Sequence, residues 1–126
     1  MKILLLGANG QVGWELHRSL AVLGELTATA RQAADGCSAL DLSDADALRA
    51  AFRTLQPDVV VNAAAYTAVD KAEQEPELAA AINTHAVGIL ANEVAQSGGW
   101  LLHYSTDYVF DGSGQAPRDE TAPTAP

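Results

Sequence analysis

Apolar and polar positions alternate along the chain in a way that predicts short strands separated by helices. Short continuous apolar runs are typical of strands buried on both faces of a parallel sheet. Such runs occupy residues 3–6, 26–30, 58–62 and 100–105. Apolar residues recur at helical spacing over residues 12–23, 44–55 and 76–97.

Glycine, proline and serine mark where these helices begin and end. We expect Gly24 to end the first helix, and Ser43 to cap the amino terminus of the second. Pro57 breaks the second helix, whereas Pro76 fits the first turn of the third, which ends at Gly98. No helix or strand is predicted for residues 36–42, 63–75 or beyond 112.

The strand-helix order predicts the fold class. Each parallel return to a sheet needs a crossover, and helices supply it here. Right-handed crossovers then give a doubly wound sheet that binds ligands at the carboxyl ends of its strands. We therefore predict an α/β fold, a Rossmann-type doubly wound parallel sheet formed by residues 1–126 as one domain.

A glycine-rich turn follows the first strand and opens the first helix, which is the context of a dinucleotide-binding turn. Gly7 permits the tight turn, Gly10 lets the backbone approach a pyrophosphate, and Gly13 permits close packing of helix on strand. The amino terminus of the helix offers N–H groups and a partial positive charge to the anion. The other residues of this predicted cofactor-binding turn are Asn9, Gln11 and Val12.

The end of the second predicted strand bears on which dinucleotide binds. NAD-binding domains place an acidic residue there, which holds the ribose 2′-hydroxyl, but this chain has Arg31. Because a guanidinium can bind a 2′-phosphate, we expect NADPH to be preferred, with NADH possible. Asp41 and Leu42 can lie against the adenine, or they can simply form an acidic turn before a helix.

Composition limits the partners. The net charge of −9 argues against nucleic acid and anionic membranes. With one cysteine, Cys37, there is no internal disulfide, and the apolar run at the amino terminus is too short for a signal or a membrane span. We therefore expect a soluble cytoplasmic protein. His17, His85 and His103 lack ligand-like spacing, so no metal site is predicted.

Three longer strings resemble the extended short-chain dehydrogenase/reductase family, and within it the dTDP-4-dehydrorhamnose reductases of rhamnose biosynthesis. The strings are GQVGWEL at 10–16, NAAAYTAVDKAE at 62–73 and STDYVFDG at 105–112. Asp41-Leu42 and Asn83 also fit the resemblance. It implies reduction of a 4-keto sugar nucleotide, dTDP-4-dehydro-6-deoxy-L-mannose, to dTDP-L-rhamnose by hydride from NAD(P)H.

The same resemblance implies roles for individual residues. Thr106 would stand in for the catalytic Ser/Thr and hydrogen-bond the substrate's 4-oxygen, and Asp107 would lie against the sugar. Tyr104 would lie near the nicotinamide. The residues implied to line the ribose and diphosphate are Ala63, Ala64, Ala65 and Tyr66.

One departure from the family pattern concerns the general acid. The family uses a tyrosine in a Tyr-x-x-x-Lys helix, but no tyrosine here has a lysine four residues later, since Lys2 and Lys71 are the only lysines. The resemblance therefore implies a sheet incomplete at its C-terminal side, without that helix or the substrate subdomain. We expect this chain to bind dinucleotide and not to transfer hydride. Some relatives use a glutamate at the position of Glu15 for magnesium at a homodimer interface, but no metal site is claimed here.

Two other functions remain open at this stage. The regulatory subunit of methionine adenosyltransferase resembles the same family, so a catalytically silent dinucleotide-binding subunit is one alternative. A sugar-nucleotide epimerase or dehydratase is the other, although Tyr108 stands where the dehydratases carry glutamate in Thr-Asp-Glu. Trp14 and Trp100 are expected in the core or at a domain interface.

Overall fold

Five parallel strands form one sheet in the computed structural model, which describes residues 1–34 and 36–125. They are β1 (Lys2–Leu6), β2 (Glu25–Ala30), β3 (Ser38–Ala39), β4 (Val59–Asn62) and β5 (Trp100–His103). Their order is β3-β2-β1-β4-β5, with every neighbouring pair parallel. The strand order reverses between β1 and β4, which is where folds of this type bind ligands. The predicted α/β, Rossmann-type architecture is confirmed, and the two residues of the predicted domain that lie outside this description are Asp35 and Pro126.

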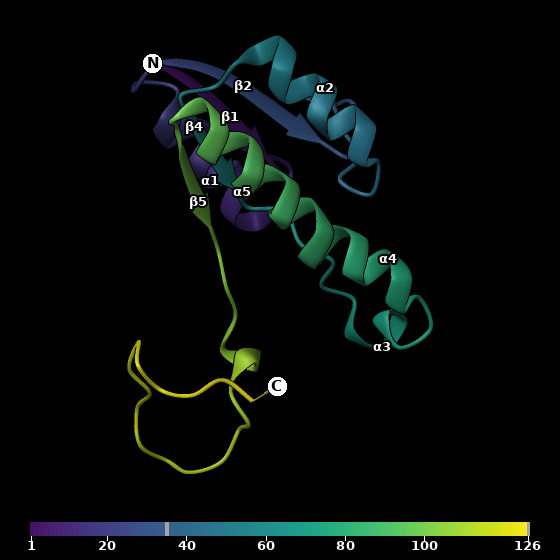
Figure 1. The fold of residues 1–126 in the computed structure, drawn as a ribbon, viewed down its shortest axis with the longest axis vertical. Coiled ribbons are helices and arrows are strands. Elements are labelled where there is room, and N and C mark those ends of the chain that lie inside the picture. The colour runs from purple at the N-terminus through teal and green to yellow at the C-terminus, as the bar shows by residue number, and fades with distance from the viewer. Residues whose placement is uncertain (35, 126) are drawn as a thin grey trace.

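Helices cover both faces of the sheet (Figure 1). The helical segments are α1 (Gln11–Leu20), α2 (Ala45–Leu55), α3 (Val69–Ala72), α4 (Pro76–Ala80), the π-helix η1 (Ala81–His85), α5 (Ala86–Ser97) and the 3-10 helix η2 (Asp107–Val109). α1 packs on β1 and β2, whereas α5 packs on β4, β5 and α2. Figure 1 shows α4, η1 and α5 following one another as one long rod that extends beyond the sheet.

The side chains of β1 alternate between two hydrophobic clusters, one on each face. Leu4 and Leu6 join the cluster under α2 and α5, and Ile3 and Leu5 join the cluster under α1. Successive residues of a strand point to opposite faces, so an unbroken apolar run is what a strand covered on both sides requires. Leu90 of α5 is fully buried in the first cluster.

The predicted cap of the second helix is wrong by one residue. Asp44, not Ser43, is the N-cap, and its carboxylate accepts hydrogen bonds from the backbone N–H groups of Asp46 (3.1 Å) and Ala47 (2.9 Å). The Ser43 hydroxyl instead donates to the Asp41 carboxylate at 2.7 Å. Because a carboxylate at this position also interacts favourably with the helix dipole, Asp44 is the stronger cap.

Several other boundaries differ from the sequence-based expectations. β3 and α3 lie in stretches for which no element was predicted, and α1 ends at Leu20 instead of continuing to Leu23. β5 ends at His103 rather than at Ser105. Residues 112–125 contain no helix or strand, as predicted.

The face of β5 on the side of α1 has no cover within the described chain. Trp100 and Leu102 pair with Val59 and Val61 of β4, which belong to the α1-side cluster, and paired residues of parallel strands share a face. Trp100 is nevertheless 73% exposed and Leu102 50% exposed. Trp14 on α1 is 55% exposed, so neither tryptophan lies in a core and that part of the prediction is wrong.

We expect Leu90→Ala to lower the free energy of unfolding by about 2–5 kcal/mol, because it removes a fully buried side chain and leaves a cavity. Val22→Ala is the control, since Val22 is 84% exposed and its truncation should change stability by less than about 0.5 kcal/mol. Urea unfolding followed by circular dichroism measures both. Equal losses in the two variants would contradict the placement of the core.

Candidate functional site

A cavity of about 670 Å³ lies at the carboxyl ends of β1, β2 and β4. Its walls come from the glycine turn, the end of β2, the approach to α2, the segment after β4 and η1. Sequence-predicted residues that line it are Gly7, Asn9, Gly10, Gln11, Val12, Arg31, Asp41, Leu42, Ala63, Ala64, Ala65 and Tyr66. Five lining residues were not among the predicted site residues: Leu6, Thr29, Leu40, Thr67 and Ile82.

Glycines allow the turn, the helix and the end of β4 to approach closely. Gly7 has a φ of +77°, and a Cβ there would stand 2.7 Å from the backbone nitrogen of Ala64. A Cβ on Gly13 would collide with the carbonyl oxygen of Gly7, so α1 can pack on the turn only with glycine at this position. Gly13 is itself buried and supports the turn from beneath.

The amino terminus of α1 opens towards the same cavity. Gly10 is the N-cap, and having no side chain it makes no side-chain capping hydrogen bond. Gln11 and Val12 of the first turn line the cavity beside it. Backbone N–H groups of a first turn have no partner within the helix, so they are available to an anionic ligand.

The buried Asn62 shapes the turn that follows β4. Its side-chain oxygen accepts a hydrogen bond from the Ala64 backbone at 3.1 Å, and its Nδ2 lies 3.2 Å from Nδ1 of His103 on β5. With the amide as donor, the His103 Nδ1 is the acceptor. Asn62 therefore joins β4 to β5 and places the alanine segment against the glycine turn. This role of Asn62 was not predicted, although the residue belongs to the string at 62–73.

Tyr66 is held by two residues distant in the sequence. The Asn83 side chain on η1 accepts from the Tyr66 backbone N–H at 2.8 Å and donates to its carbonyl at 3.0 Å. The Tyr66 hydroxyl donates to Oε2 of Glu75 at 2.6 Å. This bond to a carboxylate, with a smaller contribution from burial, raises the pKa of Tyr66 above its ordinary value.

Arg31 and Asp41 stand at another part of the cavity wall. Asp41 Oδ1 accepts from the Ser43 backbone at 2.9 Å and from the Ser43 hydroxyl at 2.7 Å. The two hydrogen bonds, and more weakly the positive charge of Arg31, lower the pKa of the Asp41 carboxyl below its usual value. One fixed negative charge therefore lies on the cavity wall with one cation.

Four predicted site residues do not line this cavity: Gly13, which packs against the glycine turn, and Tyr104, Thr106 and Asp107. Tyr104 is 49% exposed, and Thr106 and Asp107 belong to the segment that leaves the sheet after β5 (Figure 1). The Thr106 hydroxyl accepts from the Tyr108 backbone at 3.2 Å and so caps η2. Arg118 folds the end of this segment on itself by hydrogen bonds to Asp111 (2.8 Å) and to the carbonyl of Ser113 (2.7 Å).

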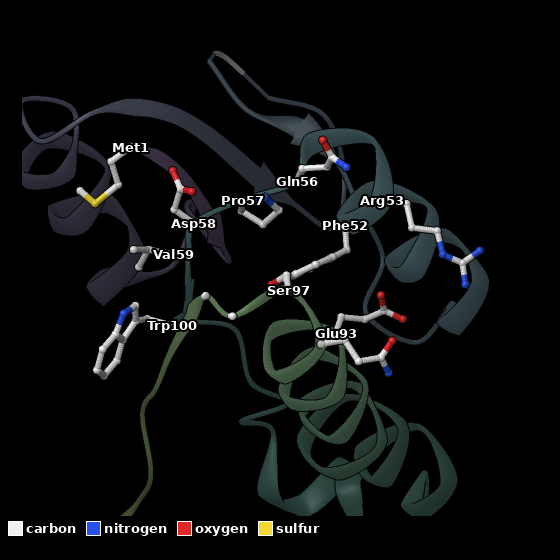
Figure 2. Close-up of a pocket in the computed structure, with 13 residues that line it drawn as sticks. Met1, Phe52, Arg53, Gln56, Pro57, Asp58, Val59, Glu93, Ser97 and Trp100 are labelled. Carbon is white, nitrogen blue, oxygen red and sulfur yellow. The ribbon is translucent and has the colours of Figure 1, made fainter.

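A second cavity, of about 750 Å³, lies at the opposite end of the sheet (Figure 2). It is bordered by the carboxyl ends of α2 and α5 and by the amino ends of β4 and β5. In Figure 2 the Arg53 guanidinium points away from Phe52, and Trp100 projects away from the hollow. Its lining includes no residue of the glycine turn or of the first turn of α1.

Across residues 1–34 and 36–125, no three His, Cys, Asp or Glu side chains are grouped so that they could hold a metal ion. Within the same residues, no helix is both long enough and apolar enough to span a membrane.

Comparison with known proteins places the whole chain in one group. Residues 1–126 match the family model described as the RmlD substrate binding domain. The dTDP-4-dehydrorhamnose reductase of Escherichia coli K12 is 51% identical over the full chain, which spans 42% of that relative's length.

Solved structures agree with this placement. A hypothetical dTDP-4-dehydrorhamnose reductase from Sulfolobus tokodaii superposes with a TM-score of 0.92, at 38% identity, over all of this chain and 46% of that one. The Bacillus anthracis dTDP-4-dehydrorhamnose reductase, solved in complex with NADP, has a TM-score of 0.87 at 30% identity, covering 99% of this chain and 43% of that one.

The Tyr66–Glu75 hydrogen bond predicts an alkaline titration. The Tyr66 phenol should ionise above its ordinary value, and Glu75→Gln should lower its pKa towards that value because the charged acceptor is gone. The folded state holds this proton more tightly than the unfolded state. Its contribution to stability is therefore present below the unfolded pKa and is lost as the pH rises through the folded pKa.

Absorbance at 295 nm measures this ionisation, and subtracting the curve of Tyr66→Phe isolates Tyr66. Glu77→Gln removes a neighbouring exposed carboxylate of α4 and serves as the control. Identical Tyr66 curves in the wild type and Glu75→Gln would disprove the assignment.

Proposed function

This chain belongs to the RmlD substrate binding domain family, and on that basis we propose that it is the dinucleotide-binding portion of a dTDP-4-dehydrorhamnose reductase. The complete enzyme would reduce dTDP-4-dehydro-6-deoxy-L-mannose to dTDP-L-rhamnose with NADPH, in dTDP-rhamnose biosynthesis. The chain spans about two-fifths of the curated relatives it matches, so the part proposed for it is cofactor binding. The observation that carries the proposal is the uncapped amino terminus of α1, which opens into the switch-point cavity.

The residues of the cavity fit a dinucleotide. A Cβ on Gly10 would touch only the Gly7 carbonyl oxygen, at 3.4 Å, so the remaining space above this backbone is free for a pyrophosphate. The N–H groups of the first turn of α1 would bind its oxygens. Ala63, Ala64 and Tyr66 would border the ribose and diphosphate from the β4 side. The Bacillus anthracis relative, solved with NADP, supports this assignment.

Arg31 supports NADPH as the preferred cofactor, with NADH also accepted. It is exposed at the end of β2 and lines the cavity, where a guanidinium can bind a 2′-phosphate through two hydrogen bonds. Asp41 and Leu42 line the same wall and would contact the adenine.

The chemistry that bound NADPH supplies is a hydride for the 4-keto carbon of the sugar. Thr106 would hydrogen-bond the 4-oxygen and orient the carbonyl, Asp107 would lie against the sugar, and Tyr104 would border the nicotinamide. The alcohol also needs a proton on its oxygen, and this sequence has no tyrosine with a lysine four residues later to supply it. We therefore expect binding without turnover.

The uncovered face of β5 supports the proposal that this chain binds the cofactor while other parts of a longer protein supply the general acid and bind the substrate. Trp100 and Leu102 leave apolar surface exposed on the α1 side, and the outer edge of β5 has no neighbouring strand in the described sheet. Both features are liabilities unless further chain or a partner covers them. In a protein of the relatives' length, we expect the Tyr-x-x-x-Lys helix to pack on this face and a separate subdomain to bind the dTDP-sugar.

Two other functions are weaker alternatives to the reductase. A catalytically silent dinucleotide-binding subunit would use the same cavity, and a sugar-nucleotide epimerase or dehydratase would differ in the groups after Thr106. We also propose a cytoplasmic location, assembly as a homodimer and no nucleic-acid partner, given the net charge of −9 and the biosynthetic relatives.

Replacing Gly10 tests the pyrophosphate site. Gly10→Ala should leave the free energy of unfolding within about 0.5 kcal/mol, because φ at Gly10 is −78° and the new Cβ has room. It should weaken NADPH binding roughly tenfold or more, because the Cβ occupies the space of the ligand. Isothermal titration calorimetry measures the affinity.

Gly88→Ala is the matched control for this experiment. Nothing lies within 4 Å of a Cβ at Gly88 on α5, so this variant should bind NADPH like the wild type. If Gly10→Ala binds NADPH with wild-type affinity, the pyrophosphate does not lie where we propose.

An activity assay tests the proposed division. Oxidation of NADPH followed at 340 nm, with dTDP-4-dehydrorhamnose as substrate, should show no turnover by this chain, while the Escherichia coli relative serves as the positive control. Measurable reduction by the chain would contradict the assigned absence of a general acid.

A further inference from the structure

A carboxylate and a guanidinium meet at the carboxyl ends of two neighbouring strands. In the parallel pairing of β2 with β3, Ala30 lies opposite Ala39, and the Leu40 N–H continues the ladder by donating to the Ala30 carbonyl at 2.7 Å. Arg31 directly follows β2, and Asp41 follows Leu40. Neighbouring strands are about 4.8 Å apart, so both residues emerge at the same corner of the sheet. Both line the cavity that also contains the glycine turn.

The two charges differ in how firmly they are held. The two hydrogen bonds from Ser43 fix the Asp41 carboxylate in place. Arg31 forms no ion pair with any residue of 1–34 and 36–125, and its side chain is exposed. A fixed anion therefore faces the cavity beside an exposed cation.

We propose that Asp41 opposes Arg31 and so sets how strongly this cavity prefers a dinucleotide with a 2′-phosphate over one with a 2′-hydroxyl. The inference rests on the dinucleotide-binding function proposed above for the same cavity. Arg31 alone would favour the ligand with the 2′-phosphate. Because the Asp41 carboxylate lies at the same corner, the preference for the 2′-phosphate depends on the attraction by Arg31 less the repulsion by Asp41.

Simple electrostatics gives the direction for each ligand. A 2′-phosphate carries about −1.5 to −2 charges at neutral pH; Arg31 attracts it and Asp41 repels it. A ribose 2′-hydroxyl is neutral, and a carboxylate can accept its proton in a hydrogen bond. Asp41 therefore weakens NADPH binding more than NADH binding.

The test compares both cofactors on the same variants. Asp41→Asn keeps an oxygen that can accept from Ser43, so the turn before α2 is preserved while the charge is removed. We expect the ratio of NADPH to NADH affinity to rise about three- to tenfold, by calorimetry at low salt. The increase should shrink at high ionic strength. Arg31→Gln should move the ratio the other way.

Asp46→Asn provides the charge-matched control. Asp46 is a fully exposed carboxylate in the first turn of α2 and does not line the cavity, so its removal should leave the ratio within about twofold. Both cofactors contain the adenine, so any effect of an Asp41–adenine contact on affinity cancels in the ratio. Adenosine 2′,5′-bisphosphate against 5′-AMP repeats the comparison without the nicotinamide.

The outcomes separate the two proposals. If neither cofactor binds the wild type, the dinucleotide function is wrong and the role proposed for Asp41 is overturned with it. If both bind and Asp41→Asn leaves the ratio unchanged, or lowers both affinities equally, the opposing role of Asp41 is overturned while dinucleotide binding stands. An equal rise in Asp46→Asn would show an effect of overall charge and would also overturn it.

Discussion

The close approach of three backbones at Gly7 is the constraint on which the rest of the structure depends. The carbonyl of Gly7 lies where a side chain on Gly13 would stand, and the segment after β4 lies where a side chain on Gly7 would stand. Without these contacts α1 could not begin directly at the carboxyl end of β1. Its free N–H groups would then not face the cavity. The absence of a Cβ atom at Gly7 and Gly13 therefore allows both the packing of α1 and the position of the anion site.

The segment after β4, which forms one side of that cavity, depends on two amide side chains. Asn62 fixes Ala64, two residues further along, and Asn83 holds the backbone of Tyr66 from seventeen residues away. Buried or bidentate amides of this kind have few alternative partners, so they restrict the loop to one arrangement. The loop therefore keeps its shape although it contains only the short helix α3.

Much of the fold could be predicted from the sequence because its strongest signals are local. The apolar run of β1 and the glycine turn identify themselves by composition, and nearly all of the predicted cofactor residues line one cavity. β3 could not be found, because Ser38 and Ala39 form a strand of two exposed residues with no apolar signal. The roles of Glu75 and Asn83 were missed because they depend on partners nine and seventeen residues away.

The π-helix η1 allows the continuous segment from α4 to α5 to contact both the sheet and the loop that contains Tyr66. Its backbone hydrogen bonds join residues five apart, as from the Ala86 N–H to the Ala81 carbonyl, whereas those of an α-helix join residues four apart. The π-helix therefore contains one extra residue in its turn. One residue corresponds to a rotation of about 100° around a helix axis. The stripe that begins at Ala86 and includes Leu90 faces the sheet, while the preceding turn is rotated so that Asn83 faces the Tyr66 loop. Deleting one residue here would restore a regular helix and remove that rotational offset, so that core packing and loop anchoring could no longer both be satisfied by the same rod.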